Sequence, residues 1–365
     1  MSRRSCSHPP SYQRPWDVVP KCPVSRGAVR FRLMSWGRIA GLGVLAWVLV
    51  DPADGIPPGA GESDRGLLGK HSDLVESVAF HPEGRWVASA GGDKSVFLWD
   101  VNRRELAMDL QPAHEVDPTW MRSLAFTPDG LTLAGASDGG SVTLWDVVSG
   151  NLRHSFRASP RSVRCLAFAP DGQLLATGSA DHSIALWDMA TLRRRAVLLG
   201  NPRQVNCVVF SPDGRTLASA GTDGTARLWD VSSGGNIWTM NVATINPKPV
   251  QCVAFSPDGR ILATACLSSG VAFWDAATGR QLETHWKCEP GPMTLAFSPV
   301  GRMLAWGTID GRIELWDAAV NRRISVFRGH SKAVMSLAFS PDSKTLASGG
   351  NDTTVRIWEV PLQDR

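Results

Sequence analysis

The chain has 365 residues, of which 43% are apolar and 20% are charged, so a large core is possible and wholesale disorder is excluded. The net charge of +4 lies entirely in residues 1–62, which hold eight basic and four acidic residues, whereas the rest holds 30 of each. That balance excludes a basic nucleic-acid clamp as the body of the protein, and 15 Trp against one Tyr point to a repeated motif.

The N-terminal segment has three parts. Residues 1–38 are basic and predict a disordered extension, and residues 51–63 read as a Pro/Gly linker. Between them, 39–50 is an unbroken apolar run, short for a bilayer span but suited to a signal peptide that begins at Met34. This pattern favours export or membrane association through 39–50. The alternative is a cytoplasmic chain whose apolar run packs on the body.

One unit then recurs seven times. In each copy a Phe is followed 19 positions later by a Trp, and successive Trp are 42 to 46 residues apart. Such a period is typical of a propeller blade built from four short strands. The seven pairs are Phe80/Trp99, Phe126/Trp145, Phe168/Trp187, Phe210/Trp229, Phe255/Trp274, Phe297/Trp316 and Phe339/Trp358.

The local pattern predicts the strands of each unit. A turn such as Ser-Pro-Asp-Gly at 211–214 follows each Phe, and apolar runs on both sides make it a β-hairpin. A third, alternating strand ends at the Trp, and a fourth must fit before the next unit. We therefore predict an all-β, seven-bladed propeller of four-stranded antiparallel blades over 64–361, followed by a tail at 362–365. Since the chain stops after the third strand of the last unit, about 64–69 is predicted to complete that blade and close the ring.

Trp-Asp closes six units, and Trp358-Glu359 closes the seventh. With these residues the chain resembles the WD-repeat (WD40) family, in the variety with x-Pro-Asp-Gly hairpin turns. The resemblance implies a buried, hydrogen-bonded set of His, Ser or Thr, Asp and Trp in each blade. Two complete sets match, His71/Ser89/Asp93/Trp99 and His330/Ser348/Asp352/Trp358. Partial sets are Thr177/Asp181/Trp187, Ser219/Asp223/Trp229 and Asp310/Trp316.

Other positions depart from that pattern. Gly139 takes the Asp position of the second unit, with Asp138 displaced by one, and Ser268 takes it in the fifth. In the sixth unit Trp306 replaces the hydroxyl residue. We expect these blades to depend more on apolar packing.

No sequence motif indicates a convincing catalytic or metal site. Gly135-Ala136-Ser137-Asp138-Gly139 matches a hydrolase nucleophile pattern but lies in a turn between strands, without the helix that this pattern needs. The seven Cys show no metal-ligand spacing, and Cys165, Cys207 and Cys252 read as small packing residues. We expect no catalytic residue, no metal and no cofactor.

A binding surface is the stronger hypothesis. In this family partners commonly meet the loops that lead into each innermost strand, and the contact position falls four residues before the repeat Phe. Arg and Trp often dominate interface energy. The candidate residues are Glu76, Trp120, Arg122, Arg161, Arg164, Arg203, Asn206 and Gln251.

These residues predict a non-catalytic scaffold for a protein or peptide partner, acidic or phosphorylated if the arginines meet it, and not for nucleic acid. Two alternatives remain. One is an enzyme with a site in the central channel. The other is a regulatory or sensor module that acts with a partner chain.

Overall fold

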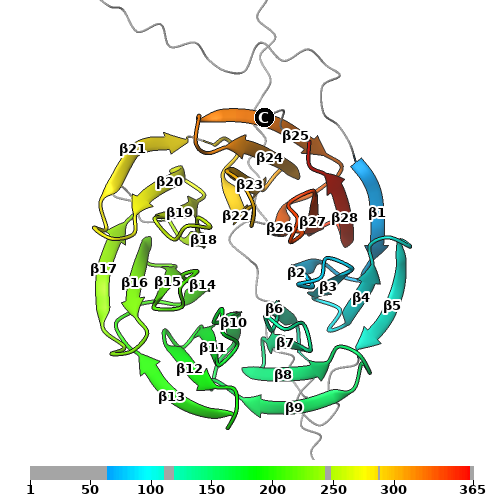
Figure 1. Cartoon of the computed structure of the whole chain (residues 1–365), viewed down its shortest axis with the longest axis horizontal. Coiled ribbons are helices and arrows are strands. Elements are labelled where there is room, and N and C mark those ends of the chain that lie inside the picture. The colour runs from blue at the N-terminus through cyan, green and yellow to red at the C-terminus, as the bar shows by residue number, and fades with distance from the viewer. Residues whose placement is uncertain (1–63, 111–118, 243–247, 287, 362–365) are drawn as a thin grey trace, which may run out of the picture. The chain divides into compact units, whose positions relative to one another are not determined.

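The computed structural model describes residues 64–110, 119–242, 248–286 and 288–361. Within these ranges every regular element is a β-strand, and the strands form seven four-stranded antiparallel sheets. Figure 1 shows the sheets arranged radially around a central opening. The predicted all-β, seven-bladed fold is thus confirmed. The predictions for 1–38, 39–50, 51–63 and 362–365 lie outside the described residues.

Each blade runs from an innermost strand at the channel to an outer strand at the rim. The innermost strands are β2 (Val75–Phe80), β6 (Met121–Phe126), β10 (Val163–Phe168), β14 (Val205–Phe210), β18 (Val250–Phe255), β22 (Pro292–Phe297) and β26 (Val334–Phe339). The second strands are β3 (Trp86–Gly91), β7 (Thr132–Ser137), β11 (Leu174–Ser179), β15 (Thr216–Gly221), β19 (Ile261–Cys266), β23 (Met303–Thr308) and β27 (Thr345–Gly350). The third strands are β4 (Val96–Asp100), β8 (Ser141–Asp146), β12 (Ile184–Asp188), β16 (Thr225–Asp230), β20 (Gly270–Asp275), β24 (Arg312–Asp317) and β28 (Thr354–Glu359). The outer strands are β5 (Glu105–Leu110), β9 (Leu152–Arg157), β13 (Arg193–Leu198), β17 (Asn236–Asn241), β21 (Gln281–Trp286), β25 (Arg322–Arg328) and β1 (Asp64–Lys70).

The hairpin turns form because their residues satisfy the backbone locally. At 127–130, Gly130 N donates to Thr127 O at 2.9 Å, and Gly130 has a φ of 73° that a residue without a Cβ adopts freely. Asp129 Oδ1 accepts from Thr127 Oγ1 at 2.5 Å and from Leu131 N at 3.0 Å. These bonds fix the register of β6 and β7.

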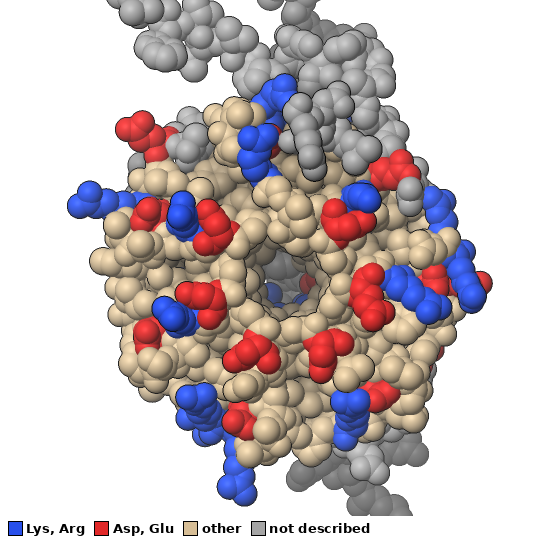
Figure 2. All heavy atoms as spheres, viewed as in Figure 1, with Lys and Arg blue, Asp and Glu red and all other residues tan. Residues whose placement is uncertain are grey.

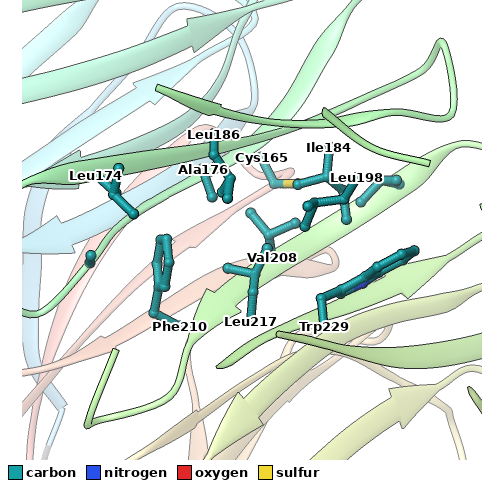
Figure 3. Packing of buried hydrophobic residues seen from close by; sticks show 12 residues of the cluster. Cys165, Leu174, Ala176, Ile184, Leu186, Leu198, Val208, Phe210, Leu217 and Trp229 are labelled. Carbon is teal, nitrogen blue, oxygen red and sulfur yellow. The ribbon is translucent and has the colours of Figure 1, made fainter. Parts of the chain in front are cut away.

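Apolar layers between neighbouring blades make up the core. The second strands β7 and β11 are buried at every position, because a blade is covered on both of its faces. Figure 3 shows one such layer, in which Leu186 and Ile184 of one blade face Val208 and Trp229 of the next. Full burial of such side chains contributes about 1.5–3 kcal/mol each, so most of the stability lies between blades.

Side-chain hydroxyls also link the innermost strands around the channel. Ser77 Oγ accepts from Leu124 N of the next blade at 3.0 Å, and Ser123 Oγ accepts from Leu166 N at 3.2 Å. Ser336 Oγ accepts from Val78 N at 3.0 Å across the junction of the last and first blades. The position three residues before the repeat Phe is therefore a bridge between blades.

The last blade combines both ends of the described chain. Its strand order is β1-β28-β27-β26, and Lys70 of β1 lies opposite Thr354 of β28. Leu68 is buried, and a Cβ at Gly69 would overlap the ring of Trp99 in the first blade. β1 thus covers the edge of β28 and contacts the neighbouring blade.

Candidate functional site

The polar set of the first blade forms one continuous hydrogen-bonded chain. His71 Nδ1 lies 3.0 Å from both carboxylate oxygens of Asp93, and His71 Nε2 lies 2.7 Å from Ser89 Oγ. Trp99 Nε1 donates to the same hydroxyl at 2.7 Å. With Nδ1–H donating to Asp93, the Ser89 hydroxyl donates to Nε2 and accepts from the indole, so every buried group has a partner.

The seventh blade repeats this arrangement. His330 Nδ1 lies 2.9 Å from Asp352 Oδ1, and His330 Nε2 lies 2.7 Å from Ser348 Oγ. Trp358 Nε1 donates to Ser348 Oγ at 2.8 Å. Both histidine side chains are fully buried, so these His–Asp pairs hold strands together and face no open site.

The carboxylates of both sets are stabilised in their charged form. Burial raises the pKa of Asp93, but the hydrogen bond from His71 and those from the backbone N–H groups of Ser72 and Ser95 lower it more. Its pKa therefore lies below the ordinary value, and that of Asp352 is depressed for the same reasons. A depressed carboxyl pKa stabilises the fold above the unfolded-state value of 3.8, and this stabilisation is lost as pH falls below it.

We therefore expect the two complete sets to account for part of the acid sensitivity of the protein. The double variant Asp93→Asn/Asp352→Asn should melt lower at pH 7 but show a smaller drop in melting temperature between pH 4 and pH 2 than the parent. Circular dichroism melts across this range measure both slopes. Equal slopes would contradict the electrostatic role.

The partial sets of the third and fourth blades keep the bond between indole and hydroxyl. Trp187 Nε1 donates to Thr177 Oγ1 at 3.0 Å, and Trp229 Nε1 donates to Ser219 Oγ at 2.9 Å. In the third blade Ser159 Oγ donates to Asp181 Oδ2 at 2.9 Å. A serine thus provides the contact to Asp that His makes elsewhere.

In the fourth blade an arginine makes the contact to Asp that His makes in the complete sets. Arg227 Nη1 lies 2.9 Å from Asp223 Oδ2 and 3.3 Å from Asn201 Oδ1, and Arg227 is only 8% exposed. The repeat pattern of the sequence did not predict a role for Arg227. Its signal was a long basic residue two positions before the repeat Trp, in a unit that lacks the His.

The sixth blade replaces polar contacts with stacked indoles. The ring of Trp316 lies 5.4 Å from that of Trp306 and 4.7 Å from that of Trp286 of the fifth blade. Trp316 Nε1 donates to Glu314 Oε2, while Asp310 binds Thr308 and Arg312. The structure therefore does not join Asp310 to Trp316 in one set.

On the face formed by the loops that lead into the innermost strands, Arg122 lies in a dense network. Arg122 Nη1 lies 2.7 Å from Glu76 Oε1, and Arg122 Nη2 lies 2.8 Å from Asp138 Oδ1. The guanidinium carbon also lies 5.0 Å from the ring centre of Trp120. Ser162 Oγ donates to Asp138 at 2.8 Å, so the network joins three blades. The displaced Asp138 thus has a partner that the sequence analysis missed.

Beside this network Arg164 is half-buried. Burial and the neighbouring charge of Arg122 lower the pKa of Arg164, while Glu76 and Asp138 oppose that effect. Arg164 Nε is buried with no hydrogen-bond partner among the described residues. Buried donors are nearly always paired, so this nitrogen and the few others like it, such as Asn201 Nδ2 and Trp306 Nε1, stand out among the described residues.

The remaining candidate residues differ in exposure. Arg161 and Arg203 are exposed, and Gln251 is half-buried. Asn206 Nδ2 donates to Val250 O of the next blade at 3.0 Å, so Asn206 also holds two blades together. We call the eight candidates, from Glu76 to Gln251, the arginine face.

The hairpin turns carry acidic residues, in contrast to the arginines of the arginine face. Six of the seven turns carry an acidic residue at their third position, namely Glu83, Asp129, Asp171, Asp213, Asp258 and Asp342. Consecutive turns touch, as Pro128 does with Gly172 and Pro170 with Gly214. Figure 2 shows acidic side chains gathered around the mouth of the central channel, with basic ones farther out.

The family model described as WD domain, G-beta repeat matches residues 64–100, 110–146, 150–188, 193–230, 241–275 and 321–359. These matches cover more than half of the chain. The chain belongs to the WD40 family. No curated protein matches it.

The WD40 model leaves residues 276–320 unmatched, and this stretch holds β21 of the fifth blade and β22–β24 of the sixth. The sixth blade has Trp306 at the hydroxyl position, and it still folds as β22–β25. WD40 propellers are generally non-catalytic scaffolds for protein interaction. Within the residues that the structure describes, no group of three or more His, Cys, Asp or Glu is arranged for a metal ion. The same residues include no helix long and apolar enough to cross a membrane.

Proposed function

We propose that this WD40 protein is a non-catalytic scaffold that binds a protein or peptide partner on the arginine face. Arg122 is already neutralised by Glu76 and Asp138, so it does not offer a free charge to a ligand. Its role is to position its neighbours. Its contacts hold Trp120 in place, and a rigid aromatic side chain at a loop surface is a typical interface anchor.

The observation that carries the proposal is Arg164. A buried donor without a partner costs about 1–3 kcal/mol, so a ligand that draws the Arg164 side chain outward to its own oxygen would relieve this cost. A carboxylate or phosphate oxygen fits best, since bonds between Arg and such groups are charge-assisted. Exposed Arg161 and Arg203 add positive charge in the same loops. We therefore propose an acidic or phosphorylated segment as the ligand.

The experiment compares two double variants that each remove two positive charges, together with the single variant Arg164→Ala. Arg161→Ala/Arg203→Ala and Arg164→Ala remove charge from the arginine face, whereas Arg193→Ala/Arg194→Ala removes it from the exposed rim strand β13. Fluorescence polarisation would use peptide panels that carry Ser, Glu or phosphoserine at matched positions. Each variant of the face should weaken binding of acidic and phosphorylated peptides about tenfold or more, equivalent to roughly 1.4 kcal/mol, and the rim variant should not.

Equal weakening by the rim variant would leave only non-specific charge attraction and would overturn the acidic ligand. If the panel binds nowhere, affinity capture with the full chain as bait and mass spectrometry tests the wider proposal. A regulatory module that acts with a partner chain would use the same face, so these variants also address that alternative.

Two finer points are proposed from the sequence alone. The turn sequences support assignment to the x-Pro-Asp-Gly variety of the family, and the apolar run 39–50 supports export or membrane association. N-terminal sequencing of the native protein tests the second point. A mature chain that begins just after this run would support it, and an intact Met1 in a protein recovered from the soluble fraction would contradict it.

A further inference from the structure

Three innermost strands carry a thiol at the position that bridges blades elsewhere. Cys165 of β10, Cys207 of β14 and Cys252 of β18 each lie three residues before the repeat Phe, where Ser77, Ser123 and Ser336 occur in other blades. The contacts that a thiol makes in place of the serine hydroxyl depend on the direction in which each Sγ points.

Cys207 and Cys252 point toward each other. Their Sγ atoms are 3.8 Å apart, although the residues are separated by 45 positions and belong to the fourth and fifth blades. Both residues are half-buried on strands that border the central opening (Figure 1). Cys165 is different, because it is 6% exposed and its Sγ contacts Gly178 O of its own blade at 3.8 Å.

We propose that Cys207 and Cys252 form an oxidisable dithiol, which a small-molecule disulfide converts into a covalent staple between the fourth and fifth blades. One thiolate attacks the reagent disulfide, forms a mixed disulfide and releases one reagent thiol. The second thiolate then attacks the protein sulfur of that mixed disulfide and releases the other reagent thiol. Two thiols are oxidised, one reagent disulfide is reduced to two thiols, and two protons pass to the released thiolates.

The immediate surroundings favour Cys252 as the first nucleophile. The hydrogen bond between the two sulfurs lowers the pKa of Cys252 against the opposing effect of burial. The same contact raises the pKa of Cys207. Since the thiolate is the reactive form, Cys252 should acquire the reagent and Cys207 should resolve the adduct.

Disulfide formation requires only a small movement of the two sulfur atoms. The sulfurs must approach from 3.8 Å to about 2.05 Å, which side-chain rotation and a slight shift of two strands can supply. The link would add a covalent bond between strands that already meet through packing, through the Asn206 bond to Val250 O and through the contact of Cys207 Sγ with Val253 O at 3.7 Å. A cross-link of this kind restricts the unfolded chain, so the oxidised protein should melt several degrees higher.

The test treats the folded full-length chain with oxidised glutathione and maps its peptides without reduction. Trypsin should release peptide 204–215 joined to 228–260, with the loss of two hydrogen atoms, and dithiothreitol should separate them. Cys207→Ser should retain one glutathione on Cys252, and Cys252→Ser should prevent the link. Cys165→Ser is the matched control and should leave the link unchanged.

Serine already occupies this position in three other blades, so these variants should keep the fold, and circular dichroism verifies that. Glutathione adducts on both Cys207 and Cys252 without a link would overturn the proposal. Unmodified peptides at these two cysteines after full exposure to the reagent would also overturn it. A link formed equally well in Cys252→Ser would show that other cysteines react instead.

Discussion

Deletion of residues 64–70 is expected to lower the melting temperature of the propeller by about 10 °C or more. The deletion removes β1, exposes the edge of β28 and takes Leu68 out of the core. The lost burial and strand pairing amount to about 5 kcal/mol. Thermal melts followed by circular dichroism measure the shift, and an unchanged melting temperature would show that β1 does not hold the ring closed.

Two adjacent leucines provide a matched pair for the same prediction. Leu68 is 6% exposed and Leu67 is 43% exposed, so they lie on opposite faces of β1. Leu68→Ala should cost about 2–4 kcal/mol, whereas Leu67→Ala should cost less than about 1 kcal/mol. These variants separate the packing of β1 from the effect of shortening the chain, and equal costs would contradict the assigned orientation.

Asp352→Ala should be the most damaging single substitution in the polar sets, with a loss of about 3–5 kcal/mol. Its carboxylate accepts from His330 Nδ1 at 2.9 Å, from Ser331 N at 2.8 Å and from Thr354 Oγ1 at 2.7 Å. Without it, these three donors and the backbone N–H of Thr354 lose their acceptor, and three of the four belong to the buried residues His330 and Thr354. Chemical denaturation monitored by Trp fluorescence gives the free energy of unfolding.

Asp310→Ala is the control for that measurement. Asp310 has the same position in its unit, but its side chain is 42% exposed and its main partner is Arg312 at 2.8 Å. Exposed ion pairs contribute about 0–1 kcal/mol, so this variant should remain within that range of the parent. A loss as large as that of Asp352→Ala would show that position in the repeat, rather than burial, decides the cost.

Much of the fold could be predicted because it depends on local patterns that recur. The spacing from Phe to Trp and the x-Pro-Asp-Gly turns specify hairpins through backbone geometry, and each copy repeats the information. The polar residues of the first and seventh blades could be located in the same way, since His71 and His330 lie at a fixed distance from their Trp.

The candidate site could be predicted less well. The sequence placed Arg122 and Arg164 together and treated both as charges that face a ligand. In the structure Arg122 is paired with Glu76 and Asp138, whereas Arg164 Nε has no hydrogen-bond partner among the residues that the structure describes. The difference depends on Glu76 of the first blade and on Asp138 of the same blade as Arg122, which is displaced by one position from the repeat pattern.

The sequence by itself determined the number of blades, the order of strands within each blade and the residues that form the two complete polar sets. These follow from contacts within one repeat, where the period fixes which residues meet. Only the tertiary structure decided which side chains meet between blades: Arg122 with Glu76, Trp286 with Trp316, and Cys207 with Cys252. Ring closure brings equivalent positions of neighbouring units side by side, and the side-chain rotamers there depend on packing in three dimensions.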